Sequence, residues 1–380
     1  MTDQPAWRPL FERSVQAFYD GALTEGREAC ERLLSLSDLP DHIVELTRQN
    51  LTHYAIGLPD LAPTATFHRL DIPVAPGWSR FNPSIAATPD GFRVLIRSSN
   101  YWVEKGRIAI LGQSDVVRTA YSVADLDASL AVRRVVPVVD ETEPAGRFPT
   151  WARDYEDCRL IAVDGEWFAV GATRERNPDA VSQAALLRFA DNAFRDLRLL
   201  SDAADGRDER NWMPAATPDG ALRFIYSCGP TVALQPDAAT GVVEAIRHPA
   251  PPLARWFRGG SQLLPVDDGY LCVIHEGIDF EGPARTYLHR WVSFDAAFRI
   301  DRISPPFYFL YRGTEYCAGM ARDGDHLLLS FGLDDREAFL ARLPLADALA
   351  SLAPPFAVDQ TLDDAERLAP PVEALHASMG

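Results

Sequence analysis

The chain has 380 residues, of which 47% are hydrophobic and 10% aromatic, and its formal net charge is −17. This composition is typical of a folded protein with one large domain or two smaller ones, and it excludes a disordered chain. The negative charge argues against a general binder of nucleic acid or anionic membranes, because both partners are polyanions.

The cysteine pattern and the apolar runs bear on the cellular compartment. Five cysteines occur without a C-x-x-C pair, so we expect buried free thiols in a reducing compartment, without disulfides or a bound metal. The N-terminal residues lack the apolar centre of a signal peptide, and no stretch approaches the roughly eighteen apolar residues of a membrane span. These features predict a cytoplasmic protein without membrane insertion.

The N-terminal part of the chain has helical periodicity. Apolar residues recur on one face of the first predicted helix, at Leu10, Phe11, Val15 and Phe18. We expect a repeat-like helical cap over residues 1–60 that packs on the domain following it.

The next region contains a repeated hairpin signal. An Asp-Gly pair between two apolar, β-branched or aromatic runs occurs five times, with its glycine at 91, 165, 220, 269 and 324. Such a pair favours a two-residue hairpin turn, because both residues accept positive φ. The spacing leaves room for a four-stranded sheet at each hairpin, which predicts a mainly β fold with a five-bladed β-propeller over 61–350. Residues 351–380 are expected to form a C-terminal tail.

Polar residues gather at the hairpin ends far from the turns. Pairing outward from each Asp-Gly turn sets Ser84 opposite Arg97, Glu156 opposite Thr173, Trp212 opposite Ser227, and Gln262 opposite His275. If these hairpins are the inner strands of the blades, the polar ends converge at one mouth of the central channel. The sequence therefore predicts a binding site there, although each cluster could also simply end its own strand.

The residue types at this mouth favour a small anionic or polyhydroxylated ligand. Guanidinium groups bind phosphate through paired hydrogen bonds, and an indole face packs against a sugar ring. Glu156 and Asp157 are adjacent, so a regular strand would point them to opposite faces, and we expect Glu156 to pair with Arg159 or a neighbouring blade. The candidate residues are Asn82, Arg97, Asp157, Arg159, Arg174, Arg210, Asn211, Trp212, Gln262, His275 and Glu315.

The motifs FNPSI, YEDCRL, RNWMP, RGGSQ and HEG, in this order over residues 68–340, resemble those of glycoside hydrolase family 130 and the related glycosyltransferase family 108. The resemblance implies a five-bladed propeller that phosphorolyses β-mannosides with inversion and releases α-mannose 1-phosphate. Some members of the family hydrolyse instead. This chain departs from the family pattern at Cys158, where proline is common, and at Arg210, where lysine is usual.

The resemblance also implies roles for individual residues. Asp157 matches the proton donor, which acts through the 3-hydroxyl of mannose, so that attack by phosphate needs no second carboxylate. The phosphate ligands correspond to Arg97, Arg174 and His275. The implied sugar-pocket or supporting positions are Asn82, Arg159, Arg210, Asn211, Trp212, Gln262 and Glu315.

We therefore expect an inverting phosphorylase of a mannoside-like glycan, with inorganic phosphate as co-substrate and no other cofactor. The alternatives are a sugar-nucleotide-dependent glycosyltransferase, a β-mannoside hydrolase, and a non-catalytic glycan-binding propeller. The expected partners are an oligosaccharide or glycan, and either a glycosyltransferase or a second copy of the chain, but no nucleic acid.

Overall fold

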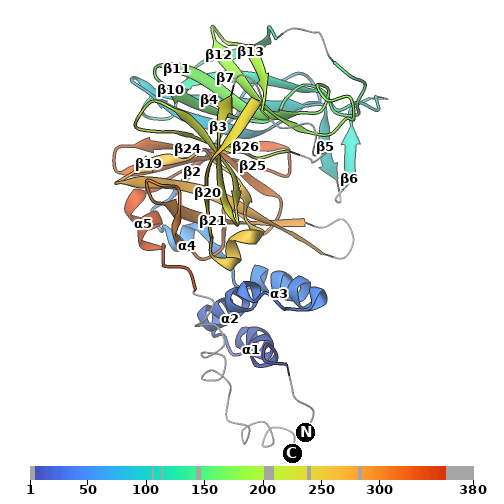
Figure 1. Ribbon diagram of the computed structural model, residues 1–380. Helices are drawn as coiled ribbons and strands as arrows, with labels where there is room; N and C mark the ends of the chain where they lie inside the picture. Colours follow the sequence, from blue (N-terminus) through green and yellow to red (C-terminus); the bar gives the residue numbers. More distant parts are fainter. Residues whose placement is uncertain are drawn as a thin grey trace, which may run out of the picture.

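The computed structural model describes residues 5–104, 107–112, 114–142, 147–200, 209–237, 241–280 and 285–356. It is mainly β, with a propeller-like arrangement of sheets and a group of helices at one end (Figure 1). Most of the predicted C-terminal tail, residues 357–380, lies outside the described residues. No helix of the described part is long and apolar enough to cross a membrane.

The N-terminal helices are α1 (Arg8–Tyr19), α2 (Leu23–Ser35) and α3 (Asp41–His53). Helix α2 has the acidic Glu25 in its first turn and the basic Arg32 in its last turn. Both charges interact favourably with the helix dipole. The helices pack on one another through Leu10, Ala29, Leu33, Leu39 and Ile43.

The predicted apolar face of the first helix is only partly buried. Leu10 is buried, but Val15 is 38% exposed and Phe18 47% exposed. The reason is that α1 contacts the other two helices along one narrow stripe, whereas the helical periodicity of a sequence cannot say how wide the covered stripe is.

The first two sheets follow one another along the chain. In order of hydrogen bonding, the first sheet comprises β3 (Ser79–Thr88), β4 (Gly91–Ser99), β7 (Thr119–Leu126) and β8 (Val132–Pro137). A separate hairpin of β5 (Tyr101–Glu104) and β6 (Arg107–Ile110) extends from it. The second sheet comprises β10 (Glu156–Val163), β11 (Glu166–Thr173), β12 (Gln183–Ala190), β13 (Ala193–Leu199) and β9 (Val139–Asp140).

The third and fourth sheets occupy the middle of the chain. The third comprises β14 (Met213–Ala216), β15 (Leu222–Cys228), β16 (Thr231–Asp237) and β17 (Gly241–His248). The 3-10 helix η2 (Pro252–Trp256) leads into the fourth. The fourth sheet comprises β18 (Arg258–Gly259), β19 (Leu264–Val266), β20 (Gly269–Asp279), β21 (Arg285–Phe294), β22 (Ile300–Ile303), β23 (Phe307–Tyr308) and β1 (Ile56–Gly57).

The fifth sheet joins the two ends of the sheet-forming region. Its strands are β24 (Glu315–Asp323), β25 (His326–Leu333), β26 (Glu337–Pro344) and β2 (Thr66–Arg69). Strand β2 comes from the N-terminal side and pairs antiparallel with β26, after the short helix α4 (Leu58–Leu61). Helix α5 (Leu345–Ala350) follows β26. This pairing ties the beginning of the region to its end.

Successive sheets contact one another in chain order, in most cases through their first strands. Strand β3 contacts β10, β10 contacts β14, β15 contacts β18, β20 contacts β24, and β24 contacts β3. These contacts run from each sheet to the next and from the fifth sheet back to the first.

The helices share a core with the fourth sheet. Cys30, Leu34 and Leu51 pack in one cluster with Ile274 and Ile278 of β20. Arg290 of β21, which is 1% exposed, donates to Glu31 of α2 and to Glu276 of β20, at 2.5 Å each. All five cysteines are buried and free, as predicted.

The four predicted cross-strand pairs are wrong in register. Ser84 pairs with Leu95, Glu156 with Ala172, and His275 with Arg258, while the first pair of β14 is Met213 with Ile225. Only the second hairpin turns on its Asp-Gly pair, with Asp164 at φ 50° and Gly165 at φ 80°. In the first, fourth and fifth hairpins the turn is displaced by one residue from the Asp-Gly pair, and in the third a longer turn contains the pair. Bulges after Phe81 and Glu156 shift the pairing further.

Candidate functional site

The site begins with a backbone feature shared by three first strands. Asn82, Asp157 and Asn211 have φ of 45°, 47° and 61°, although none is glycine. Asparagine and aspartate accept this left-handed conformation more readily than other residues with a side chain. Asn82 and Asp157 lie at the bulges of β3 and β10, and Asn211 lies two residues before β14, so regular strand alternation does not set the direction of these side chains.

A glycine of a neighbouring sheet packs closely against two of these left-handed residues. A Cβ added to Gly259 would lie 1.8 Å from the carbonyl oxygen of Asn211. One added to Gly332 would lie 2.2 Å from Oδ1 of Asn82. Glycine is therefore required at both positions for the neighbouring sheet to approach the site.

Asp157 is the point where the first two sheets meet. Its Oδ1 accepts hydrogen bonds from Nδ2 of Asn82 at 2.9 Å and from Nη1 of Arg97 at 2.8 Å. The Asp157 side chain is 22% exposed, whereas that of Arg97 is 5% exposed. Burial by itself would raise the pKa of Asp157, but the positive charge of Arg97 and the hydrogen bond from Asn82 hold it below its usual range. Asp157 is therefore ionised at neutral pH.

Arg159 connects the remaining sheets beneath Asp157. It donates from Nε to the carbonyl oxygen of Gly260 at 2.6 Å and from Nη1 to that of Asp157 at 2.9 Å. Its Nη2 donates to Oδ1 of Asn211 at 3.2 Å and to the Tyr316 hydroxyl, which itself donates to Asn211 at 2.8 Å. Because Arg159 is 1% exposed, it supports the site from below.

Gln262 is a second connection between sheets. Its Nε2 donates to the carbonyl oxygens of Ile85 at 2.8 Å and Met320 at 2.7 Å, and its Oε1 accepts from the Met320 amide at 3.1 Å. The buried side-chain amide is thus occupied by backbone groups of the first and fifth sheets. This favours a role in holding the sheets together over the predicted contact with substrate.

His275 lies within a group of aromatic rings. Its ring centroid is 5.0 Å from that of Tyr287 and 5.1 Å from that of Tyr316. Burial, together with the charge of Arg159, lowers the pKa of His275 to about 3. The imidazole is therefore neutral at physiological pH, so a contact of His275 with phosphate would be a hydrogen bond and not an ion pair.

Glu156 lies between two arginines of adjacent sheets. Its carboxylate oxygens are 4.0 Å from Nε of Arg174 and 3.6 Å from Nη1 of Arg210. Arg174 also donates to the carbonyl oxygen of Ala180 at 3.0 Å. Glu156 thus forms ion pairs with these two arginines, and Arg159 is held elsewhere.

Two predicted substrate residues are enclosed by protein. Trp212 is 3% exposed, packs on Phe224 and Tyr226, and donates from Nε1 to Glu209 at 2.9 Å, so its indole faces do not form an open platform. Glu315 is fully buried and accepts backbone N–H groups of residues 309, 310 and 311 at 2.6 to 3.0 Å. It therefore holds the loop before β24.

The structure adds a carboxylate that the sequence analysis missed. Oδ2 of Asp335 accepts a hydrogen bond from the Tyr101 hydroxyl at 2.9 Å. Burial, with a further contribution from the charge of Asp157, raises the pKa of Asp335 to about 6 despite the opposing effect of Arg97. Asp335 lies in the turn between β25 and β26, outside every motif that pointed to the site, and its position on that turn was the only signal.

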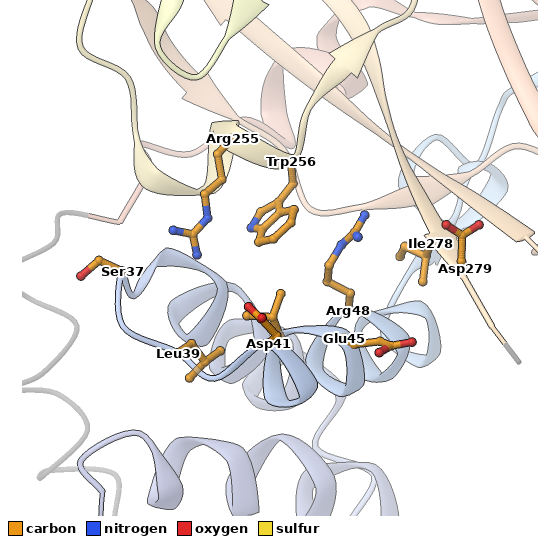
Figure 2. Close-up of a pocket in the computed structure, with 10 residues that line it drawn as sticks. Ser37, Leu39, Asp41, Glu45, Arg48, Arg255, Trp256, Ile278 and Asp279 are labelled. Carbon is orange, nitrogen blue, oxygen red and sulfur yellow. The ribbon is translucent and has the colours of Figure 1, made fainter.

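A cavity of about 530 Å³ lies away from these residues, between α3, η2 and the end of β20 (Figure 2). Trp256 stands in it between Arg48 and Arg255, whose guanidinium carbons are 4.7 and 5.0 Å from the indole centroid. None of the predicted site residues lines this cavity. Within the described residues, no group of three or more histidine, cysteine, aspartate or glutamate side chains is arranged to hold a metal ion.

No family model and no curated protein matches the sequence. Among solved structures, the chain is similar to one from the GH130 family of mannoside phosphorylases. That family contains glycoside hydrolases that target β-1,2 mannosidic linkages in Candida mannan. The solved structure is 13% identical, with a TM-score of 0.53 over 77% of this chain and 97% of that one. A glycosyl hydrolase from Bacteroides ovatus is 12% identical, with a TM-score of 0.51 over 74% and 94%. A β-1,2-mannobiose phosphorylase from Listeria innocua is 11% identical, with a TM-score of 0.49 over 75% and 99%. At these identities the likeness to the first two structures shows a shared fold.

Proposed function

We propose that this protein is a carbohydrate-active enzyme that phosphorolyses a β-mannoside-like glycan with inversion and releases α-mannose 1-phosphate. The observation that carries the proposal is Asp157, a partly exposed carboxylate fixed by Asn82 and Arg97 where the first strands meet. Two fold neighbours, one from the GH130 family of mannoside phosphorylases and one a glycosyl hydrolase, support this choice of substrate class.

We also propose that the sheets form one five-bladed ring. The support is that the described residues include five sheets of at least four strands, and that contacts run from each sheet to the next and from the fifth back to the first. Such a ring places Asp157 at the mouth of a central channel.

In this proposal Asp157 delivers the proton that the leaving oxygen requires. The free carboxyl is ionised because of Arg97, so it must take up a proton when substrate binds. A bound sugar excludes water from the carboxyl and favours its neutral form. Asp335, with its pKa of about 6, is a nearby group that still carries protons near neutral pH.

Phosphate is assigned to Arg174 and Arg210. Both lie beside Glu156 on different sheets, at 4.0 and 3.6 Å from its carboxylate oxygens. A phosphate dianion accepts charge-assisted hydrogen bonds from two such guanidinium groups. Attack by this anion on the anomeric carbon, opposite to the proton delivered from Asp157, gives inversion without a second catalytic carboxylate.

The test is incubation of the full chain with β-linked manno-oligosaccharides, with and without inorganic phosphate. We expect α-mannose 1-phosphate only when phosphate is present. Equal release of free mannose in both reactions would replace phosphorolysis with hydrolysis. Absence of any product across β-1,2 and β-1,4 linkages would reject the enzyme proposal for these substrates.

A further inference from the structure

A second cavity adjoins the candidate site on the third sheet. Its volume is about 520 Å³, within the ~300–1,000 Å³ range of small-molecule sites. The ends of β14 and β15 and the segment from η2 to β18 line it. Asn211 and Gly259 belong both to this cavity and to the hydrogen-bonded group around Arg159 and Tyr316. These two residues therefore link the cavity to the group that holds Asp157.

The walls of this cavity carry an excess of positive charge. Arg210, Arg247 and Arg258 line it from separate segments, whereas Glu209 is its acidic lining residue. The Glu209 carboxylate accepts hydrogen bonds from the Trp212 indole at 2.9 Å and the Tyr226 hydroxyl at 3.3 Å. This concentration of arginine contrasts with the net charge of −17 for the chain.

Arg258 is the cation best placed to accept a ligand. Its side chain is exposed, and its Nη1 donates to the carbonyl oxygens of Arg255 at 3.2 Å and Phe257 at 3.1 Å. Within the described part of the chain it has no carboxylate partner. Arg247, across the cavity, is held by Glu244 through Nε at 3.1 Å and Nη2 at 2.5 Å. The cavity thus has one uncompensated guanidinium and two that are paired at its edges.

We propose that this cavity binds the part of the substrate that leaves mannose, and that this part carries a phosphoryl group. The inference rests on the proposed function, which places mannose at Asp157. Guanidinium groups bind phosphoryl oxygens strongly and in a defined geometry. A sugar phosphate and a nucleoside diphosphate both present this group, and the aromatic residues Tyr226 and Phe257 beside the arginines suit either.

The experiment is isothermal titration of the full chain at constant ionic strength with mannose, mannose 6-phosphate, guanosine diphosphate and inorganic phosphate. We expect mannose 6-phosphate or the diphosphate to bind about tenfold more tightly than mannose and than inorganic phosphate. Arg258→Ala should weaken that ligand about tenfold and leave mannose unchanged. The tighter of the two phosphoryl ligands identifies the source of the group.

Arg299→Ala is the matched control, since Arg299 is an exposed arginine paired with Asp295 in the hairpin turn of the fourth sheet. Equal binding of all four ligands, or the same small loss in Arg258→Ala and Arg299→Ala, would overturn the inference. Tight binding of inorganic phosphate that depends on Arg258 would also overturn it, because the cavity would then hold the free anion. These titrations need no turnover, so the cavity can be verified even where manno-oligosaccharides give no product.

Discussion

At the scale of single residues, Asp157 combines a partly exposed carboxylate, a fixed position and a depressed pKa. We predict that Asp157→Asn loses turnover by about 10²–10⁴-fold, because the amide cannot deliver a proton. The fold should remain, since the amide still accepts hydrogen bonds from Asn82 and Arg97. Product formation and thermal unfolding measure the two effects.

Asp196→Asn is a close control for this substitution. Asp196 also has a left-handed backbone, with φ of 49°, and an arginine partner, but it lies on β13 with its side chain 65% exposed. It should keep full activity. Unchanged turnover in Asp157→Asn would remove Asp157 as the acid, and loss of its folded state would make it a structural residue.

Asp335 gives a prediction about pH. Its pKa is raised from 3.8 to about 6, so the folded protein binds this proton more tightly than the unfolded chain. The resulting stabilisation is complete below pH 3.8 and is lost as the pH rises through about 6. Asp335→Asn should therefore gain stability relative to the original protein between pH 4 and 7, as measured by thermal unfolding. The control is Asp334→Asn. Asp334 is the exposed neighbour of Asp335, and its φ of 49° is close to the 51° of Asp335. A difference between Asp335→Asn and the original protein that does not change with pH contradicts the assignment.

At the scale of elements, helix α2 is anchored to the fourth sheet through Glu31. Its carboxylate meets Arg290, which also binds Glu276, and all three side chains are at most 9% exposed. We predict that Glu31→Ala destabilises the protein by about 3 kcal/mol, because the buried guanidinium of Arg290 loses one of its two carboxylate partners. Urea unfolding gives this value. Glu28→Ala, on the same helix, should change stability by less than about 1 kcal/mol, and equal losses would reject the anchor.

This contact also explains the HEG motif. Glu276 bonds Arg290 through Oε1 and is fully buried, while the adjacent His275 faces the tyrosines of the site. The motif thus joins the helices and the site through one strand, β20. Its glutamate serves the attachment of the helices, which the sequence alone could not distinguish from a contact with substrate.

At the scale of the whole molecule, the pairing of β2 with β26 joins the beginning and end of the sheet-forming region. Phe67 of β2 packs edge-on against Phe331, with ring centroids 6.4 Å apart. Phe67→Ala should cost about 2 kcal/mol of unfolding free energy, less than a fully buried phenylalanine because Phe67 is half-buried. The adjacent exposed Thr66→Ala should cost under about 0.5 kcal/mol in the same urea experiment. Equal effects would mean that β2 does not hold the fold closed.

The sequence by itself determined the mainly β class, the order of the hairpins and the buried free cysteines, because these follow from local periodicity and from residue type. It also singled out Asn82, Arg97, Asp157, Arg159 and Asn211, which the structure brings together. Only the tertiary structure decided how exposed each candidate is and which groups it contacts. Bulges and displaced turns changed the register, neighbouring sheets enclosed Gln262, Trp212 and Glu315, and burial neutralised His275. Each of these depends on groups distant in sequence, because burial and electric charge act through space and not along the chain.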